Sequence, residues 1–191
     1  MLYVVDSWVR GVTVLYNIMY VVCDKSSTIR LYNTDTHSPL DRVINVDGMK
    51  RPWDIVVCRD DRQLYVADCS DSLWRVSVDD HSYVKWLSTE STTHTFDALS
   101  VTSRRLLVTS WWWPPRRLRQ YSTTDRQLLR VVELPQYVKC VLHGVETTRG
   151  TFVVGHEGTS QNKWQYAVSE LYVVSLLQCY NEECAMCLLP N

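Results

Sequence analysis

The sequence predicts an all-β protein that forms a segment of a β-propeller, with about three to four four-stranded blades, an incomplete ring and an irregular C-terminal tail. An apolar run that ends in Asp, from Met19 to Asp24, recurs 45 residues later as Leu64 to Asp68. A weaker copy, from Leu106 to Ser110, follows 42 residues after that. A repeat of about 40–45 residues with four short strands is typical of a propeller blade. Abundant valine, 11 Tyr and 8 Trp also favour strands over helices.

Each copy of the apolar run opens the same order of elements: a polar turn, an alternating strand, a second turn, a third strand and a closing run. The alternation from Trp74 to Val78 is what a strand with one buried face requires. Closing runs begin at Trp53-Asp54 and at Phe96-Asp97. Gly and Pro number only 6 each, so Asp, Asn, Ser and Thr must supply most of the turns, as at 33–35, 79–80 and 123–125.

These elements divide the chain in order. Residues 1–18 end a partial blade, residues 19–63, 64–105 and 106–150 form three blades, residues 151–170 form a partial blade, and residues 171–191 are a tail outside the repeat. Closed propellers need about 4–8 blades. We therefore expect either missing blades or a homodimer to close the ring.

Composition excludes some classes of function and sets the expected compartment. The 191 residues are 46% hydrophobic with a net charge of −1, so nothing in the overall charge attracts nucleic acid or an anionic membrane. No apolar run approaches the roughly 20 residues that cross a bilayer, and the N-terminus lacks the features of a signal peptide. We expect a cytoplasmic protein. The 7 cysteines are odd in number and irregularly spaced, which indicates reduced thiols, with Cys23 and Cys58 as small buried hydrophobes.

Two segments resemble a known propeller family. The run from Leu64 to Asp68, with its polar turn and the strand from Leu73 to Val76, resembles the strand–turn–strand signature of the NHL-repeat propellers, and more loosely that of the YncE-like propellers. The run from Lys50 to Val57 is similar to the family's Pro-led segment, but Trp53-Asp54 and Phe96-Asp97 stand where the family prefers Gly. The resemblance spans roughly residues 9–155.

The resemblance implies an interaction module. In animals these propellers often form the substrate-binding, C-terminal part of tripartite-motif ubiquitin ligases. This sequence has no RING or B-box module, so a ligase activity would belong to a portion outside it.

The most unusual local run is Trp-Trp-Trp-Pro-Pro-Arg-Arg-Leu-Arg, which begins at Trp111. Successive strand residues point to opposite sides, so three consecutive indoles cannot all face one core and at least one should be exposed. Exposed Trp and Arg are enriched at the energetic centres of protein interfaces, and they also suit stacking and phosphate contact in RNA binding. A loop packed against a neighbouring blade is the plain structural alternative. The predicted partner-binding residues on the blade rim are Trp111, Trp112, Trp113, Arg116, Arg117 and Arg119.

Other candidate groups carry less chemistry. Asp24, Asp54, Asp68 and Asp97 recur at repeat positions, where we expect them to bond backbone amides in turns and between blades rather than to bind Ca²⁺. A catalytic zinc needs three clustered ligands, and of the histidines only His143 is expected to reach a central channel, as in zinc-dependent propeller lyases.

The Cys184–Cys187 pair is a lone CxxC without a second pair, and no common catalytic motif occurs. We therefore predict a non-catalytic module without cofactor or metal that binds a protein partner through a blade-rim face. The alternatives are an RNA-binding NHL-type propeller, or a hydrolase or lyase with a metal in the central channel.

Overall fold

The computed structural model describes residues 8–69, 71–88, 96–110, 117–138, 140–157 and 166–171. These residues form fifteen strands and no helix, so the all-β prediction is confirmed. It follows that the described part of the chain offers no helix that could cross a membrane.

The strands group into successive antiparallel sheets in which each strand pairs with its neighbour in sequence. The first sheet is β1 (Val9–Leu15), β2 (Ile18–Cys23), β3 (Thr28–Asn33) and β4 (Pro39–Asn45). The second is β5 (Pro52–Cys58), β6 (Gln63–Asp68), β7 (Ser72–Ser77) and β8 (Tyr83–Ser88). The third is β9 (Leu99–Thr102), β10 (Arg105–Thr109), β11 (Arg117–Ser122) and β12 (Leu128–Glu133). The fourth contains β13 (Val141–Glu146), β14 (Phe152–Glu157) and β15 (Tyr166–Leu171).

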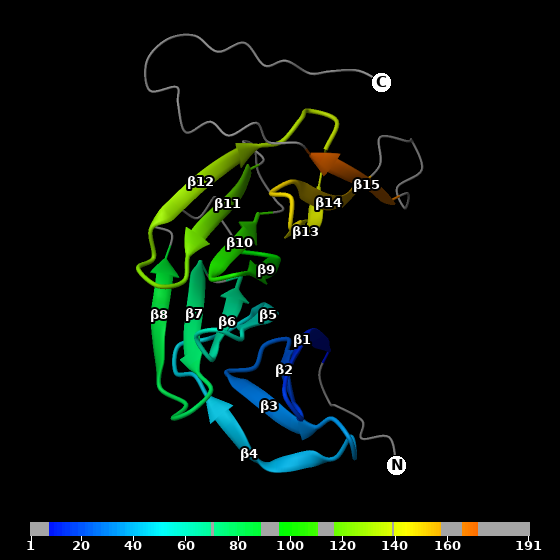
Figure 1. The fold of residues 1–191 in the computed structure, drawn as a ribbon. Helices are drawn as coiled ribbons and strands as arrows, with labels where there is room; N and C mark the ends of the chain where they lie inside the picture. Colours follow the sequence, from blue (N-terminus) through cyan, green and yellow to red (C-terminus); the bar gives the residue numbers. More distant parts are fainter. Residues whose placement is uncertain are drawn as a thin grey trace.

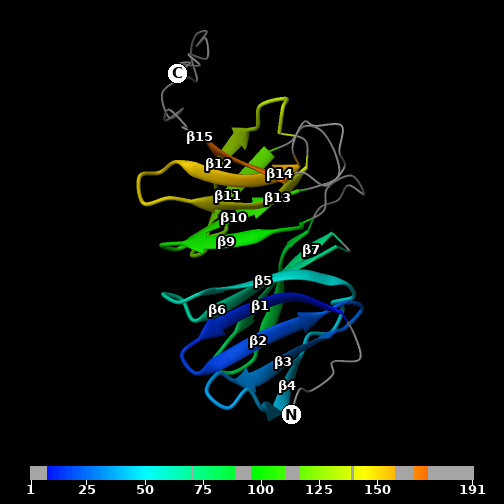
Figure 2. The ribbon, with the colours of Figure 1, turned by 90° about the vertical axis from the view of Figure 1, so that its right-hand side faces the viewer.

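The four sheets follow one another along an open arc, as in part of a propeller (Figure 1). The first strands of successive sheets contact one another, β1 with β5, β5 with β9 and β9 with β13, and so form the inner side of the arc. Figure 2 views this inner side, and the last strands β4, β8 and β12 lie on the outer side (Figures 1 and 2). The predicted incomplete ring is confirmed, because the first and fourth sheets lie at opposite ends of the arc.

The repeat seen in the sequence and the sheets are offset by one strand. The predicted unit 19–63 contains β2, β3, β4 and then β5, which is the innermost strand of the following sheet. The same offset separates the units 64–105 and 106–150 from the second and third sheets. A sequence repeat has no inherent starting point, and only the pairing of β5 with β6 shows to which sheet a closing run belongs. The tail at 171–191 lies outside the described residues apart from Leu171.

The core lies between the sheets in three separate layers. The first layer joins residues of the first and second sheets, with Tyr20 and Ile29 packed against Val66 and Trp74. The second layer is centred on Trp86 of β8, whose ring meets those of Tyr65 and Tyr121 at centroid distances of 5.0 and 6.1 Å. The third layer packs Leu118 against Phe152 and its neighbours. Since each sheet buries both faces only when it has a neighbour on each side, stacking is a condition of stability.

The turn between the third and fourth strands has one design in three sheets. Asn33, Ser77 and Ser122 each accept the amide of the residue four positions later, namely His37, His81 and Arg126. These three later residues all have positive φ, between 55 and 63°. Side chains at the turn also accept backbone amides, as Asn33 Oδ1 does from Asp35 at 2.8 Å. Asp, Asn and Ser thus supply the turn chemistry, as the shortage of Gly and Pro predicts.

One glycine controls the contact between the first two sheets. A Cβ atom at Gly11 would lie 2.8 Å from the backbone nitrogen of Ile55 and 3.0 Å from the Cα of Asp54. A backbone cannot swing aside as the end of a flexible side chain can. Gly11 therefore allows β1 to approach β5 closely enough for the first core layer to form.

Gly11→Ala is expected to lower the free energy of unfolding by about 1–3 kcal/mol, the usual cost of overpacking a well-packed site. Urea denaturation followed by tryptophan fluorescence measures this change. The matched control is Gly155→Ala on β14, where the new Cβ would be 3.8 Å from the nearest atom, the His143 carbonyl oxygen. That variant should be as stable as the parent or slightly more so, because Gly weakens a strand interior. Equal losses in both variants would contradict the role assigned to Gly11.

Candidate protein-binding face

The inner strands share a bulge near their starts. The pairing register shifts between Val9 and Gly11 in β1, between Pro52 and Asp54 in β5, and between Val141 and His143 in β13. Just before β9, Asp97 donates its amide to the Thr109 carbonyl while Ala98 accepts the Thr109 amide, so two residues again oppose one. A bulge leaves one residue outside the ladder and redirects its side chain. The bulged residues are Arg10, Trp53, Asp97 and Leu142, and we call this end of the inner strands the bulge end.

The first two bulged residues contact each other across the sheets. The guanidinium carbon of Arg10 lies 4.3 Å from the centre of a Trp53 ring, a cation–π arrangement. Arg10 Nη2 also lies 3.5 Å from Asp24 Oδ2, at the end of β2. These contacts hold an arginine and a tryptophan in place at the bulge end while both stay partly accessible.

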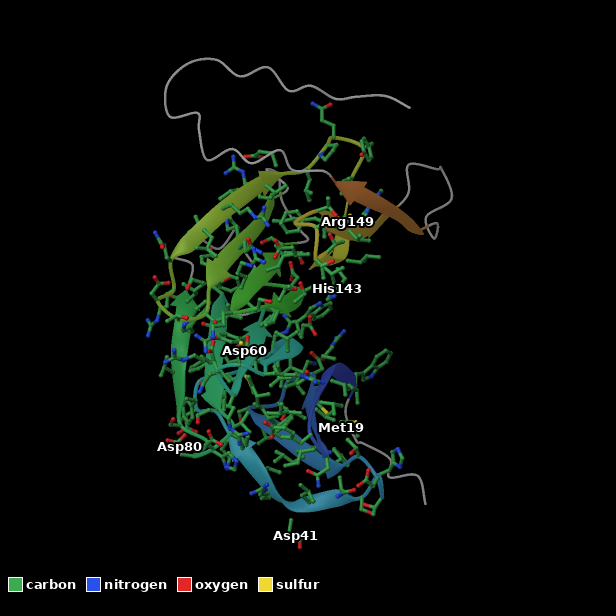
Figure 3. All side chains as sticks on the ribbon, viewed as in Figure 1. Met19, Asp41, Asp60, Asp80, His143 and Arg149 are labelled. Atoms are coloured by element: carbon green, nitrogen blue, oxygen red, sulfur yellow. The ribbon has the colours of Figure 1, made fainter. Side chains whose placement is uncertain are left out.

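The later sheets give the bulge end a different character. Leu142 is 37% exposed, and His143 beside it is also exposed. Figure 3 places His143 on the inner side of the arc, whereas Asp80 and Asp41 lie on its outer side. The bulge end therefore combines cationic, aromatic and apolar groups, a mixture that suits recognition of a protein surface.

Cys69 follows β6 at the same end. The pKa of its thiol is raised to about 11, mainly by burial and also by the nearby Asp97 carboxylate, with Arg51 acting in the opposite sense. At neutral pH the thiol is therefore protonated. Since the thiolate is the nucleophile, Cys69 is not prepared for covalent catalysis. Cys23, Cys58 and Cys69 are free thiols, and Cys23 and Cys58 are buried as predicted.

Two of the recurring aspartates, Asp54 and Asp68, bond backbone amides, as the sequence predicts, whereas Asp24 faces Arg10. Asp68 is fully buried, and its carboxylate accepts the amides of Lys50 at 2.9 Å and Arg51 at 3.0 Å. Asp54 accepts the amide of Leu99 at 2.8 Å and so ties the second sheet to the third. Burial raises the pKa of the Asp54 carboxyl, an effect opposed by the amides of Leu99 and Ile55. These carboxylates hold the propeller together.

Of the predicted partner-binding residues, two fall in the described part of the chain. Arg117 opens β11 and forms an ion pair with Glu133, its neighbour on β12, at 2.5 Å. Arg119 lies on the same face of β11 as Tyr121, whose ring contacts Trp86 of the second sheet. The other predicted residues, Trp111, Trp112, Trp113 and Arg116, lie outside the described residues.

The bulged residues were not predicted as a site. In the sequence, Trp53 is notable only as the first residue of a closing run and Asp97 only as a recurring aspartate, and Arg10 and Leu142 belong to no motif. A bulge is a property of the pairing between two strands, so one strand's sequence does not show which residue will be left out of the ladder.

The expected metal alternative finds no ligand set among the described residues, where no three His, Cys, Asp or Glu side chains lie together in a manner that could hold an ion. His143 lies on the exposed side of β13, whereas His156 on β14 is buried with a ring-centroid distance of 6.3 Å to Tyr137. The two histidines therefore do not form one site. Cys184 and Cys187 lie outside the described residues.

No protein-family model and no curated protein matches the sequence. Solved structures do match the fold. The computationally designed Ika4 protein shares 15% identity at a TM-score of 0.64, with 91% of this chain and 96% of Ika4 covered. Hydrazine synthase of Kuenenia stuttgartiensis shares 13% identity at 0.69, with 87% and 46% covered. The WD40 β-propeller domain of Doa1 shares 14% identity at 0.61, with 78% and 47% covered.

At these identities the comparisons show the fold alone, and the fold is that of a β-propeller. The chain spans about half of the hydrazine synthase and Doa1 chains that it matches, and nearly all of the designed one.

Proposed function

We propose that this β-propeller segment is a non-catalytic module that binds a protein partner at the bulge end of its inner strands. The observation that carries the proposal is the recurrence of the bulge, which removes one residue per sheet from the ladder at the same end of the inner strands. Arg10 and Trp53 are already held in a cation–π contact there, so little side-chain entropy is lost when a partner binds. Trp and Arg are the residue types that most often dominate interface energies.

The position of the Trp–Arg run, residues 111–119, also favours partner binding at the bulge end. Thr109 ends β10 and Arg117 begins β11, and Thr109 bonds both residues of the bulge at Asp97 and Ala98. Thr109 and Arg117, which lie on either side of the run in the sequence, are therefore both at the bulge end of the third sheet. We propose that the binding residues there are Trp111, Trp112, Trp113, Arg116, Arg117 and Arg119.

RNA binding is the second candidate, and the pairing of the arginines makes it the weaker one. Arg62, Arg104 and Arg117 each pair with a carboxylate, and Arg105 and Arg130 share Glu146. Phosphate contacts would have to compete with these carboxylates. The resemblance of residues 64–76 to NHL repeats supports an interaction module of that lineage, and we propose that relationship with the function.

The double variant Arg10→Gln/Arg117→Gln is expected to weaken binding of the natural partner about 30-fold or more, the loss expected when an interface centre is removed. The matched control is Arg42→Gln/Arg149→Gln, which removes the same charge from exposed arginines away from the bulge end. Figure 3 labels Arg149 at the opposite end of the β13–β14 hairpin.

Partners captured by cross-linking to the purified chain are identified by mass spectrometry, and their affinities for both variants are then compared by calorimetry. Full affinity in the bulge-end variant contradicts the proposal. Captured nucleic acid whose binding falls steeply with salt would instead establish the RNA alternative, since counterions return as salt rises.

A further inference from the structure

The first sheet presents a face with several exposed valines against which no other described sheet packs. On its side away from the second sheet, the register brings together Val12, Val21, Arg30 and Val43 across the four strands. Val12 and Val43 are both 48% exposed, and Val14, paired with Met19, is 39% exposed. Figure 3 labels Met19 near the inner strand of this sheet.

The same positions are buried in the next sheet. Val12 pairs with Val21 just after the β1 bulge, as Ile55 pairs with Val66 just after the β5 bulge. Ile55 and Val66 are 1% and 0% exposed, because the first sheet covers them. Val12 is therefore at the position that, in the second sheet, is buried against the preceding sheet.

The fourth sheet has the complementary open face at the other end of the arc. Its side away from the third sheet contains Val145, paired with Val153, and Val145 is 38% exposed. The equivalent pair in the second sheet, Val56 and Tyr65, packs against the third sheet. The fourth sheet thus ends the arc with the kind of face that, elsewhere in this chain, meets a following sheet.

We propose that a second copy of this chain covers both faces, with the fourth sheet of each copy packed on the first sheet of the other. Each sheet has one face towards the preceding sheet and one face towards the following sheet. In all three sheet contacts within the chain, a face of the second kind packs on a face of the first kind, so each contact joins two unlike faces. A head-to-tail contact between unlike faces produces a closed ring when its rotation closes. Two copies place eight sheets in that ring, within the roughly 4–8 blades of known propellers.

The lengths of two of the matched structures agree with this arrangement. The chain covers 46% and 47% of two solved chains with which it shares its fold, so two copies correspond in extent to one such chain. The contact uses the sheet faces and leaves the bulge end accessible, which makes the ring independent of the proposed binding function.

The test is the mass of the purified chain in solution, measured by sedimentation equilibrium. The wild type is expected to have twice the 22.3 kDa chain mass. Val12→Asp and Val145→Asp should each give a monomer, since each removes both contacts of the ring. Val131→Asp, an equally exposed valine on β12 away from these faces, is the matched control and should remain a dimer.

Mixing the two monomeric variants separates the proposed ring from a dimer in which the first-sheet face pairs with the same face of the other copy. Each variant keeps the face that the other has lost, so the mixture is expected to form a dimer through one intact contact. A first-sheet face that pairs with itself would leave Val145→Asp dimeric, and that result would overturn the proposal, as would a monomeric wild type or an open series of larger masses. Val43→Asp on the same face replaces Val12→Asp if circular dichroism shows that the latter loses its strands.

Discussion

Glu146→Gln is expected to lower the free energy of unfolding by about 3 kcal/mol, because it removes the shared anion from a buried network. The Glu146 side chain is 1% exposed and lies at the contact between the third and fourth sheets. Its carboxylate pairs with Arg130 and, at 3.3 Å, with Arg105, and it accepts Gln120 Nε2 at 2.7 Å. Gln120 in turn accepts Arg130 Nε at 2.8 Å.

The substitution keeps the shape of the side chain and removes only its charge. Two guanidiniums then remain beside a neutral amide, and one partner left unpaired costs more than the pair contributed. Both arginines are partly exposed, which places the loss at the lower end of the range for buried pairs.

Glu133→Gln provides the control for this prediction. It makes the same chemical change in the exposed Arg117–Glu133 pair of the third sheet, where an ion pair contributes about 0–1 kcal/mol. Urea denaturation of both variants measures the difference. Similar losses in the two variants would show that Glu146 does not organise the contact between the sheets.

Asp68→Ala is expected to cost about 3 kcal/mol or more, because it removes two charge-assisted hydrogen bonds worth roughly 1.5–3 kcal/mol each. Its two oxygens accept the amides of Lys50 and Arg51, and Trp74 Nε1 donates to Oδ2 at 3.4 Å. Asp68→Asn should lose about half as much, since one oxygen remains while the new amide group faces a backbone donor.

The comparison for Asp68 is Asp125→Asn. The Asp125 carboxylate also accepts a backbone amide, that of Gln127 at 3.2 Å, but in an exposed turn. Water replaces that bond when it is lost, so the thermal unfolding midpoint should hardly change. An Asp68→Asn protein with the same thermal unfolding midpoint as the parent would contradict the structural role of this carboxylate.

The role of Asp68 shows what could be read from the sequence. It ends an apolar run at a repeated position, and that position at the end of a strand predicted a backbone role, which Asp68 has. The repeat also identified the turn residues, because Asn33 and its equivalents recur with their neighbours. Features that the sheets share recur in the sequence at the spacing of the repeat, and this recurrence predicted the propeller.

Glu146 belongs to no such recurring pattern in the sequence. Its partners Arg105, Gln120 and Arg130 lie on three other strands, and nothing in their sequence spacing indicates that they meet. The bulged residues could not be predicted as a site for a related reason, since Arg10 and Trp53 hold equivalent positions but differ in chemistry. A site built from unlike residues at like positions appears only when the pairing of the strands is known.

The bulges have a consequence for how such a protein changes over generations. Equivalent positions hold Arg10, Trp53, Asp97 and Leu142, which shows that one backbone geometry accepts a cation, an indole, an acid and an aliphatic chain. At the accessible positions Arg10, Trp53 and Leu142, the flanking residues carry the strand pairing and the bulged residue does not, so mutation there alters what the surface displays while the scaffold persists. Asp97, by contrast, is buried. Natural variation, or a library randomised at these codons, can therefore explore new specificities one position at a time.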